Sequence, residues 1–247
     1  MNSIIHETAR IHDSTAIGAF TVIHENVVIG EECVVGSHVV IHPGTRIGNQ
    51  VRIDDHAVLG KKPMRAANSK TTAESELPDL EIGDRVIIGT GVVVYRGSRV
   101  ANKVLIADLA TVRENVTIGE ASIVGRGVAI ENKVEIGVWV KLETNVYICA
   151  YSKVGDSCFI APCVATSNDN YAGRDPDRVH HYKGVTFEKG ARAGVNATVL
   201  PGRVVGEDAM IAAGAVLTRD APGGRILAGV PARDLRAVPD RQLLENQ

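Results

Sequence analysis

Residues 82–118 read, in blocks of six, IGDRVI, IGTGVV, VYRGSR, VANKVL, IADLAT, VRENVT and a final I. Each block opens with Ile or Val, and the rhythm continues to Ile160, with 14 aliphatic residues on consecutive sixth positions. An α-helix needs a period near 3.6 residues and an ordinary strand a period of 2, so the stretch fits neither element. A period of six indicates a solenoid built from hexapeptide repeats.

The residue two places before each aliphatic site is also small or β-branched. From Val86 to Cys158 this place holds Val, Ser, Ala or Cys. Both positions are expected to point into a bore that is too narrow for aromatic side chains. The composition agrees, because the 247 residues include only three Phe, five Tyr and one Trp, fewer than a globular α/β core usually contains.

The same period runs through most of the chain and is interrupted twice. Ten earlier sites extend from Ile5 to Leu59, and six later sites extend from Phe187 to Leu217. Polar segments break the rhythm at residues 60–81 and 167–186. With Thr166 included there are 31 sites. Three sites per triangular coil predict about ten coils, and ~4.8 Å per strand gives a prism about 48 Å long.

Two units are expected along the chain. Residues 1–220 are predicted to form the all-β β-helix with its two extruded loops. Residues 221–247 are predicted to form a short helical cap over the open end, which repeat proteins require. One departure from the pattern is Arg203, which falls in an inward slot.

Composition narrows the classes of partner and compartment. The net charge is −2 with both signs interspersed, so nucleic acid is a poor candidate partner. The four Cys residues lack paired metal spacing, and Cys33 and Cys158 take small inward positions, as core residues in a reducing compartment do. No charged-then-apolar leader and no apolar run of ~18 residues is present. We expect a cytoplasmic protein without a metal site or a membrane partner.

Counting the sites assigns residues to the three edges of the prism. The loops follow sites that are 15 places apart, a multiple of three, so both loops are expected to leave the same edge. A ladder of solvated opposite charges would explain a polar column there by itself. Long loops on a regular scaffold are more often functional, however. The residues between the loops on this edge are Tyr95, Arg96, Arg113, Glu114, Asn115, Glu131, Asn132, Lys133, Cys149, Ala150 and Tyr151.

This edge and its loops are the candidate substrate site. The candidate substrate-binding residues are Lys61, Arg65, Tyr95, Arg96, Arg113, Glu114, Asn132, Asn168 and Asp169. His6, His24 and His42 also fall on this edge at a spacing of 18 residues, where a surface stack is a simpler interpretation than a metal site. Asp108 falls on a different edge.

Motifs in the third run add a family resemblance. Hexads such as Ile29-Gly30 and Val205-Gly206 resemble the left-handed parallel β-helix of hexapeptide-repeat acyltransferases. The segments ARAGVNATVLPG (191–202), AAGAVLTRDAP (212–222) and AGVPAR (228–233) resemble the signature of coenzyme A-dependent hexapeptide acetyltransferases, except that Val230 replaces the usual Asn. The resemblance implies acetyl-CoA as co-substrate and cofactor contacts from a set of four residues, Gly194, Ala213, Arg219 and Arg233.

The middle run resembles two subgroups that act on UDP- or dTDP-linked sugars. EIGDR (81–85) and YRG (95–97) are similar to UDP-N-acetylglucosamine acyltransferases of lipid A synthesis, whereas KLETNV (141–146) and TSND (166–169) are similar to nucleotide-sugar amine N-acetyltransferases. The lipid A enzymes carry an Ile-Ala-His pattern with a basic His, and this chain has Asp108 in that place. Asp108 is therefore the first candidate for a general base, and His181 and His180 are the second.

These observations predict an acetyl-CoA-dependent N-acetyltransferase for a nucleotide-linked amino sugar, acting as a homotrimer with sites between subunits. An acyl carrier protein-dependent sugar O- or N-acyltransferase is one alternative, although such relatives carry a larger helical C-terminal domain. A zinc carbonic anhydrase on the same coil needs central His ligands, and no His occurs between Arg65 and Val179. A non-catalytic β-helix scaffold is the alternative of another class.

Overall fold

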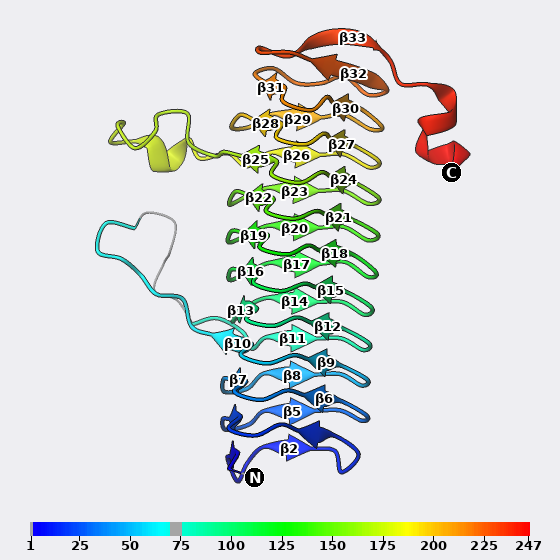
Figure 1. Ribbon diagram of the computed structural model, residues 1–247. Helices are drawn as coiled ribbons and strands as arrows, with labels where there is room; N and C mark the ends of the chain where they lie inside the picture. The colour runs from blue at the N-terminus through cyan, green and yellow to red at the C-terminus, as the bar shows by residue number, and fades with distance from the viewer. Residues whose placement is uncertain (1, 70–75) are drawn as a thin grey trace.

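The chain folds into a parallel β-helix of triangular cross-section, in which most strands are two residues long (Figure 1). The computed structural model describes residues 2–69 and 76–247. The chain passes through sheets A, B and C in turn and then returns to sheet A one level further along the prism. The predicted fold class, a left-handed parallel β-helix with two extruded loops, is confirmed.

Over the described residues the three sheets hold 11, 10 and 12 strands, against the predicted ten coils. Sheet A contains β1 (Ile4–Ile5), β4 (Val22–Ile23), β7 (Val40–Ile41), β10 (Val58–Lys61), β13 (Val93–Tyr95), β16 (Thr111–Val112), β19 (Ala129–Ile130), β22 (Tyr147–Ile148), β25 (Ala165–Thr166), β28 (Thr198–Val199) and β31 (Val216–Leu217). Sheet B contains β2 (Arg10–Ile11), β5 (Val28–Ile29), β8 (Arg46–Ile47), β11 (Glu81–Ile82), β14 (Arg99–Val100), β17 (Thr117–Ile118), β20 (Glu135–Ile136), β23 (Lys153–Val154), β26 (Thr186–Phe187) and β29 (Val204–Val205). Sheet C contains β3 (Ala16–Ile17), β6 (Val34–Val35), β9 (Arg52–Ile53), β12 (Ile87–Ile88), β15 (Leu105–Ile106), β18 (Ile123–Val124), β21 (Lys141–Leu142), β24 (Phe159–Ile160), β27 (Arg192–Ala193), β30 (Met210–Ile211), β32 (Arg225–Ala228) and β33 (Arg233–Ala237).

Neighbouring coils are joined by parallel pairing in a regular register, apart from a shift between Leu59 and Lys61 where β10 pairs with β13. β13 and β16, for example, align Val93 with Thr111 and Val94 with Val112, one coil of 18 residues apart. The backbone N–H of Val93 donates to the carbonyl of Ala110 at 3.0 Å. A two-residue strand therefore obtains its hydrogen bonds from the coils next to it rather than from within its own coil.

The bore is filled as the repeat predicts. The aliphatic residues Ile88 and Ile106 are fully buried. Polar residues are tolerated at the second inward position because their hydroxyl groups are bonded on both sides. The hydroxyl of Ser98 donates to the carbonyl of Arg113 at 2.7 Å and accepts the N–H of Val116 at 3.1 Å. Buried hydroxyl groups without such partners would destabilise the coil.

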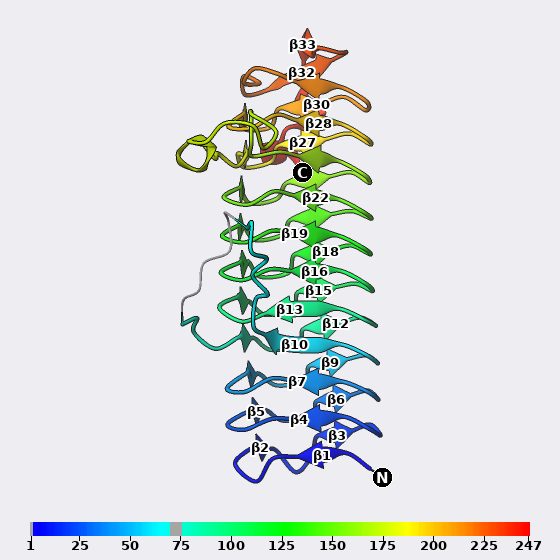
Figure 2. The same cartoon turned by 90° about the vertical axis from the view of Figure 1, so that its left-hand side faces the viewer.

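Both loops leave the carboxyl ends of sheet A strands, at the edge where the chain turns into sheet B (Figure 1). The first loop follows β10 and the second follows β25, on one common edge as the site count predicts. β10 continues through Lys61, which pairs with Tyr95, so the first loop begins two residues later than predicted. The described parts of the first loop project outward from the prism on the same side as the second loop (Figures 1 and 2). We call this edge the loop edge, and the edge between sheets C and A the C–A edge.

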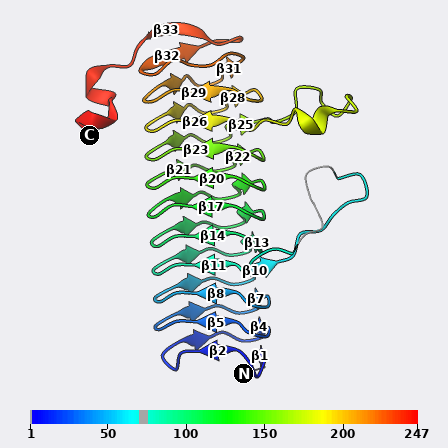
Figure 3. The same cartoon turned by 180° about the vertical axis from the view of Figure 1, so that it is seen from behind.

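The C-terminal segment closes the prism with a hairpin. β32 extends sheet C in parallel beside β30, and β33 folds back on β32 as an antiparallel strand. Two short 3₁₀ helices, η2 (Asp240–Gln242) and η3 (Leu244–Asn246), follow on the side away from the loops (Figure 3). The N–H of Leu244 donates to Asp208 Oδ1 at 3.1 Å. The expected helical cap is thus mainly a β-hairpin, and the domain boundary at residue 220 stays a prediction.

Arg203, for which the repeat pattern predicts an inward side chain, points outward in the structure. Arg203 Nη1 lies 3.6 Å from Asp220 Oδ1, and its Nε donates to the carbonyl of Pro201 at 3.3 Å. By contrast, Cys33 and Cys158 are buried in the bore as predicted. Among the described residues there is no helix with the length and apolar character needed to cross a membrane.

Aromatic rings stack from coil to coil near the N-terminus. On the loop edge the rings of His24 and His42 are nearly parallel, with centroids 5.4 Å apart. On the C–A edge the ring of His38 lies between those of Phe20 and His56, at 5.1 and 5.0 Å. In residues 2–69 and 76–247, no group of three or more His, Cys, Asp or Glu side chains is arranged to hold a metal ion.

The environment of His42 predicts a stability that decreases on acidification. Its pKa is lowered first by burial and then by the charges of His24, Lys61 and Arg96. The folded chain therefore binds fewer protons than the unfolded chain, in which the ring titrates near 6.5. The contribution of the neutral His42 ring to the free energy of unfolding is complete above about pH 6.5 and is lost as the pH falls below that value. In His42→Gln we expect the decrease in Tm between about pH 7.5 and 5.5 to be smaller by ~1–3 °C than in the wild type.

Scanning calorimetry at the two pH values measures this effect. His6→Gln is the matched control, because His6 is an exposed ring whose Nδ1 bonds to Thr8 Oγ1 in the same turn at 2.9 Å. The control is expected to keep the wild-type pH response. An equal response in the His42 variant would contradict the prediction.

Candidate active site between the two loops

Five consecutive strands of sheet A, from β10 to β22, carry a row of polar and aromatic side chains at the loop edge. In order along the prism these are Lys61, Tyr95, Arg113, Glu131 and Tyr147. Lys61 Nζ lies 5.5 Å and Arg113 Cζ lies 5.1 Å from the centre of the Tyr95 ring. Arg113 Nη1 lies 3.6 Å from Glu131 Oε2. We call this row, which spans the stretch between the two loops, the loop-edge cluster.

Arg113 is fixed in the cluster by a neighbouring carboxylate. Its Nε donates to Glu114 Oε2 at 2.9 Å and its Nη2 donates to Glu114 Oε1 at 3.1 Å. The Glu114 side chain is only 5% exposed, against 23% for Arg113. Burial opposes the charge of Arg113, but the bonds and charge of Glu114, with help from Glu131 and Tyr95, outweigh it and raise the pKa of Arg113. The site therefore contains a permanently charged guanidinium held in one orientation.

Tyr147 ends the row at the second loop. Its strand β22 pairs with β25, from which that loop leaves. Burial, then the charges of Glu131 and Cys149, and a hydrogen bond with Glu131 raise the pKa of Tyr147 to about 12. The hydroxyl group is therefore protonated at neutral pH, and its strand β22 pairs with β19, which Glu131 directly follows. Glu131 itself is 28% exposed, so this carboxylate also faces the space between the loops.

Two predicted substrate residues on the loop edge are bound to the protein itself. Arg96 Nε donates to the carbonyl of Leu77 and Nη1 to that of Pro43, each at 3.0 Å, while Nη2 pairs with Asp79. Asn132 is 2% exposed between successive coils. Arg96 thus anchors the returning end of the first loop, and Asn132 packs within the edge. A direct contact of either residue with substrate stays a prediction.

The predicted carboxylate of the second loop shapes that loop. Asp169 Oδ1 accepts the N–H of Tyr171 at 2.8 Å, and Oδ2 accepts the N–H of Gly173 at 3.0 Å. Arg178 Nε lies 3.6 Å from Asp169 Oδ2, and its Nη1 donates to the carbonyl of Gly173 at 2.7 Å. Asp169 and Arg178 therefore hold the loop in a defined conformation.

The other predicted loop residues are accessible to solvent. His180 ends the short 3₁₀ helix η1 (Arg178–His180), and His181 follows it; both are exposed. The His181 ring tilts against Tyr171 with centroids 5.7 Å apart. Asn168 is half-buried, and Arg65 is exposed in the first loop.

Asp108 lies on the C–A edge, at the other end of sheet A from the loop-edge cluster. Its Oδ1 accepts the N–H of Thr90 in the preceding coil at 2.9 Å. The same contact recurs elsewhere in the prism, as between Asp84 Oδ1 and the N–H of Asn49 at 2.8 Å. A Cβ on Gly89 would come within 2.4 Å of Asp108 Oδ1, so only glycine fits below the carboxylate. Asp108 therefore joins two coils, and this role accounts for its position without catalysis.

Two variants separate the structural role of Asp108 from catalysis. Asp108→Asn keeps an acceptor oxygen in the same place, whereas Asp108→Ala removes it. We expect the Asn variant to match the wild type in stability and transfer rate, and the Ala variant to lose about 1 kcal/mol in the free energy of unfolding. Chemical denaturation and rate measurements on both variants provide the check. A rate loss of about 10²–10⁴ in the Asn variant would restore Asp108 as the base.

The four residues that are predicted to contact coenzyme A do not all lie on the same edge of the prism. Gly194 and Ala213 are stacked in successive coils on the C–A edge, and a Cβ on Gly194 would meet the backbone N of Ala213 at 2.5 Å. The N–H of Ala232 donates to a carbonyl of β31 at 2.8 Å, which places the next residue, Arg233, near that strand. Arg219 follows β31 on the loop edge. We call the pair Gly194 and Ala213 the glycine step.

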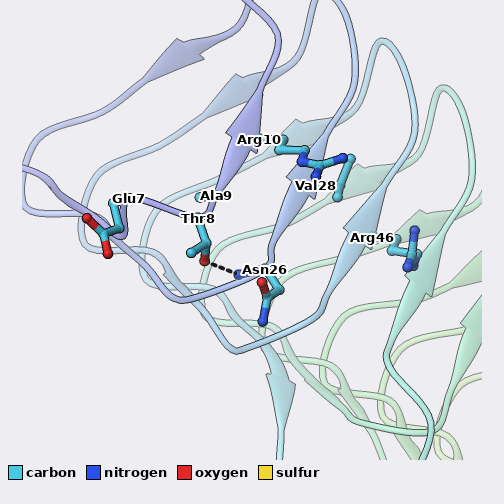
Figure 4. A pocket seen from close by; sticks show the side chains of 7 residues that line it. All are labelled: Glu7, Thr8, Ala9, Arg10, Asn26, Val28 and Arg46. Atoms are coloured by element: carbon cyan, nitrogen blue, oxygen red, sulfur yellow. Dashed lines mark hydrogen bonds between the residues drawn. The ribbon is translucent and has the colours of Figure 1, made fainter.

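A separate hollow of about 670 Å³ lies over sheet B near the N-terminus (Figure 4). Arg10 and Arg46 flank Val28 there, and Thr8 Oγ1 accepts the N–H of Asn26 at 2.9 Å. None of the predicted site residues lines this hollow. The loop-edge cluster and the glycine step therefore remain the candidate site.

Comparisons with known families identify the repeat. The model described as bacterial transferase hexapeptide (six repeats) matches residues 8–43. The model described as hexapeptide repeat of succinyl-transferase matches residues 26–61, 80–96 and 184–219. Residues 8–61, 80–96 and 184–219 are therefore similar to the hexapeptide repeats of bacterial transferases. The last matched segment contains the glycine step.

Individual relatives resemble parts of this hexapeptide-repeat protein. The 2,3,4,5-tetrahydropyridine-2,6-dicarboxylate N-acetyltransferase of Staphylococcus aureus (strain Newman) is 40% identical over 58 residues, 24% of either chain. The match thus spans about a quarter of the length of this curated relative. The solved UDP-N-acetylglucosamine O-acyltransferase of Moraxella catarrhalis has a TM-score of 0.54 and 18% identity, over 96% of this chain and 74% of its own. The Arabidopsis UDP-N-acetylglucosamine acyltransferase has a TM-score of 0.52 and 18% identity, over 95% and 74%. These structural likenesses establish the fold.

The sequence pattern placed Glu131 on the loop edge, but it did not single out Tyr147. A signal for Tyr147 was nevertheless present. The outward positions of the sheet A strands before it hold Val93, Thr111 and Ala129, and Tyr147 is the first aromatic residue in that column after the first loop. A bulky polar side chain in a column of small ones marks a position with a specific contact.

Proposed function

We propose that the protein is an acetyl-CoA-dependent N-acetyltransferase that acts on the amine of an amino sugar linked to UDP or dTDP. The observation that carries the proposal is the loop-edge cluster, which provides fixed cations between two loops. The acetyl donor is supported by the glycine step and by the signature segments around it. The partial likeness to an N-acetyltransferase supports transfer to nitrogen.

The acceptor side of the site suits a diphosphate. Arg113 is held by Glu114, so its charge is available without the cost of ordering a flexible side chain. Lys61 provides a second positive charge across the Tyr95 ring. Since two cations already contact this ring, Tyr95 positions them rather than stacking on a nucleotide base. We expect the diphosphate to bind at Lys61 and Arg113.

The donor side of the site suits an extended pantetheine arm. At the glycine step the coils approach so closely that backbone N–H and C=O groups form the surface. Arg233 and Arg219 are exposed cations for the coenzyme A phosphates. Backbone N–H groups of the coil are suited to stabilise the oxyanion of the tetrahedral intermediate.

The two halves of the site require a second copy of the chain. The loop-edge cluster and the glycine step lie at opposite ends of the sheet A strands, so one prism does not bring them together. A neighbouring copy that places its C–A edge against the loop edge would complete the site. We therefore expect a homotrimer with sites between subunits, since cyclic packing repeats the same contact three times.

A mass-spectrometric screen tests the function. Aminated UDP- and dTDP-sugars are incubated with acetyl-CoA and the protein, and products heavier by one acetyl group are sought. Acetylation of at least one nucleotide-linked amine is expected, with weaker or no reaction of the free amino sugar. Transfer only from an acyl carrier protein would favour the long-chain alternative. No transfer together with no binding of acetyl-CoA would support the scaffold alternative.

Arginine variants test the donor side. Arg233→Ala and Arg219→Ala are expected to raise the apparent KM for acetyl-CoA about 5- to 50-fold while kcat changes little, because phosphate contacts far from the thioester stabilise ground and transition states alike. Arg236→Ala is the control, since Arg236 is an exposed residue of β33 outside the signature. An unchanged KM in both test variants would place the coenzyme elsewhere.

A further inference from the structure

We propose that Glu131 accepts the proton of the attacking amine and that Tyr147 positions the Glu131 carboxylate for this step. The inference rests on the proposed acetyl transfer and assigns its proton acceptor. Glu131 lies between Arg113 on one neighbouring strand level and Tyr147 on the other. This position is inside the loop-edge cluster, where the acceptor substrate is expected to bind.

The other carboxylates near the site are already bonded. Both oxygens of Glu114 accept bonds from Arg113, and Glu114 is almost fully buried. Both oxygens of Asp169 accept backbone N–H groups of its own loop. Asp108 lies on the C–A edge and joins two coils. Glu131 remains, with a 3.6 Å approach to Arg113 that is longer than a hydrogen bond and with its side chain partly exposed.

The surroundings of Glu131 keep its carboxylate oriented without neutralising it. Tyr147 stands on the neighbouring strand β22, beside the strand that Glu131 follows, and its high pKa of about 12 means that its hydroxyl group stays protonated over the whole working range of pH. Arg113 faces Glu131 from the turn after β16, and Cys149 follows Tyr147 in the next turn. Lys133, in the same turn as Glu131, lies over a neighbouring tyrosine ring at 5.4 Å. One hydroxyl group and one nearby cation thus flank the carboxylate, which retains lone pairs for the proton of the amine.

The chemical step balances with these groups alone. The lone pair of the neutral amine forms a bond to the thioester carbonyl carbon, and the C–S bond then breaks with its electron pair on sulfur. Glu131 takes the proton that the nitrogen loses and returns it to the departing sulfur. The products are an amide and a thiol, and the carboxylate is regenerated. Tyr147 keeps its proton throughout.

Matched glutamate variants test the proposal with the substrate found by the screen. Glu131→Gln is expected to lower kcat by about 10²–10⁴-fold, with the KM for acetyl-CoA within about twofold of the wild type. Glu135→Gln is the control, because Glu135 lies in the same coil but on sheet B, where it is exposed and pairs with Lys153 at 3.1 Å. The control is expected to keep the wild-type kcat. Glu131→Asp retains a carboxylate, and its kcat is expected to be at least tenfold higher than that of Glu131→Gln.

Tyr147→Phe tests the positioning role with a readout that lost packing would not give. Without the hydroxyl group beside it the Glu131 carboxylate is oriented less well, so kcat is expected to fall about 3- to 30-fold while the KM for acetyl-CoA stays within about twofold of the wild type. Thermal unfolding of each variant shows whether the fold is intact.

The outcomes separate this inference from the proposed function. An active wild type with Glu131→Gln within about threefold of its rate across the pH range would overturn the inference and leave the proposed function standing. An unchanged kcat in Tyr147→Phe would remove Tyr147 as the positioning residue. A wild type that binds acetyl-CoA but acetylates no amine would overturn both.

Discussion

The structure depends on hydrogen bonds that run from one coil to the next. Strands of two residues cannot form a stable unit alone, and their backbone groups find partners one coil away, as the N–H of Val22 does at the carbonyl of Val39. The side chains follow the same rule, because Ser98 and Asp108 also bond to neighbouring coils. Stability therefore accumulates along the prism, and each coil protects the coils on both sides of it. Irregular segments can leave only at an edge, where they interrupt no sheet.

The period of the sequence predicts most of this architecture. Burial at every sixth residue fixes which strands share a sheet, and the number of sites between the breaks places both loops on one edge. The C-terminal hairpin escaped prediction because residues after Leu217 carry no repeat. The period predicts an inward side chain for Arg203 because it depends only on the place of a residue in the repeat. In the structure the long side chain of Arg203 turns toward Asp220 instead.

The site is less predictable than the fold for a physical reason. Packing in the bore selects the inward residues and so produces the period, but it does not constrain the outward side chains. The contacts of an outward side chain depend on which residues lie one coil before and one coil after it. Spacing placed Arg113 and Glu131 on the loop edge, but it could not show that Glu114 binds Arg113 through both oxygens. It also could not show that Asp108 bonds to the N–H of Thr90. Tyr147 became part of the site only through the pairing of its strand with β19, which Glu131 directly follows.

The distance between the two loops is set in whole coils. They leave sheet A at β10 and β25, five strand spacings apart, or about 24 Å. Loss of one 18-residue coil between them would shorten this gap by ~4.8 Å and keep both loops on one edge. Loss of a single hexad would instead turn the second loop by a third of a revolution, onto another face. In such a scaffold, insertions and deletions change the distance between two loops in fixed steps of one coil. Only a change of three hexads, or a multiple of three, keeps both loops on the same edge.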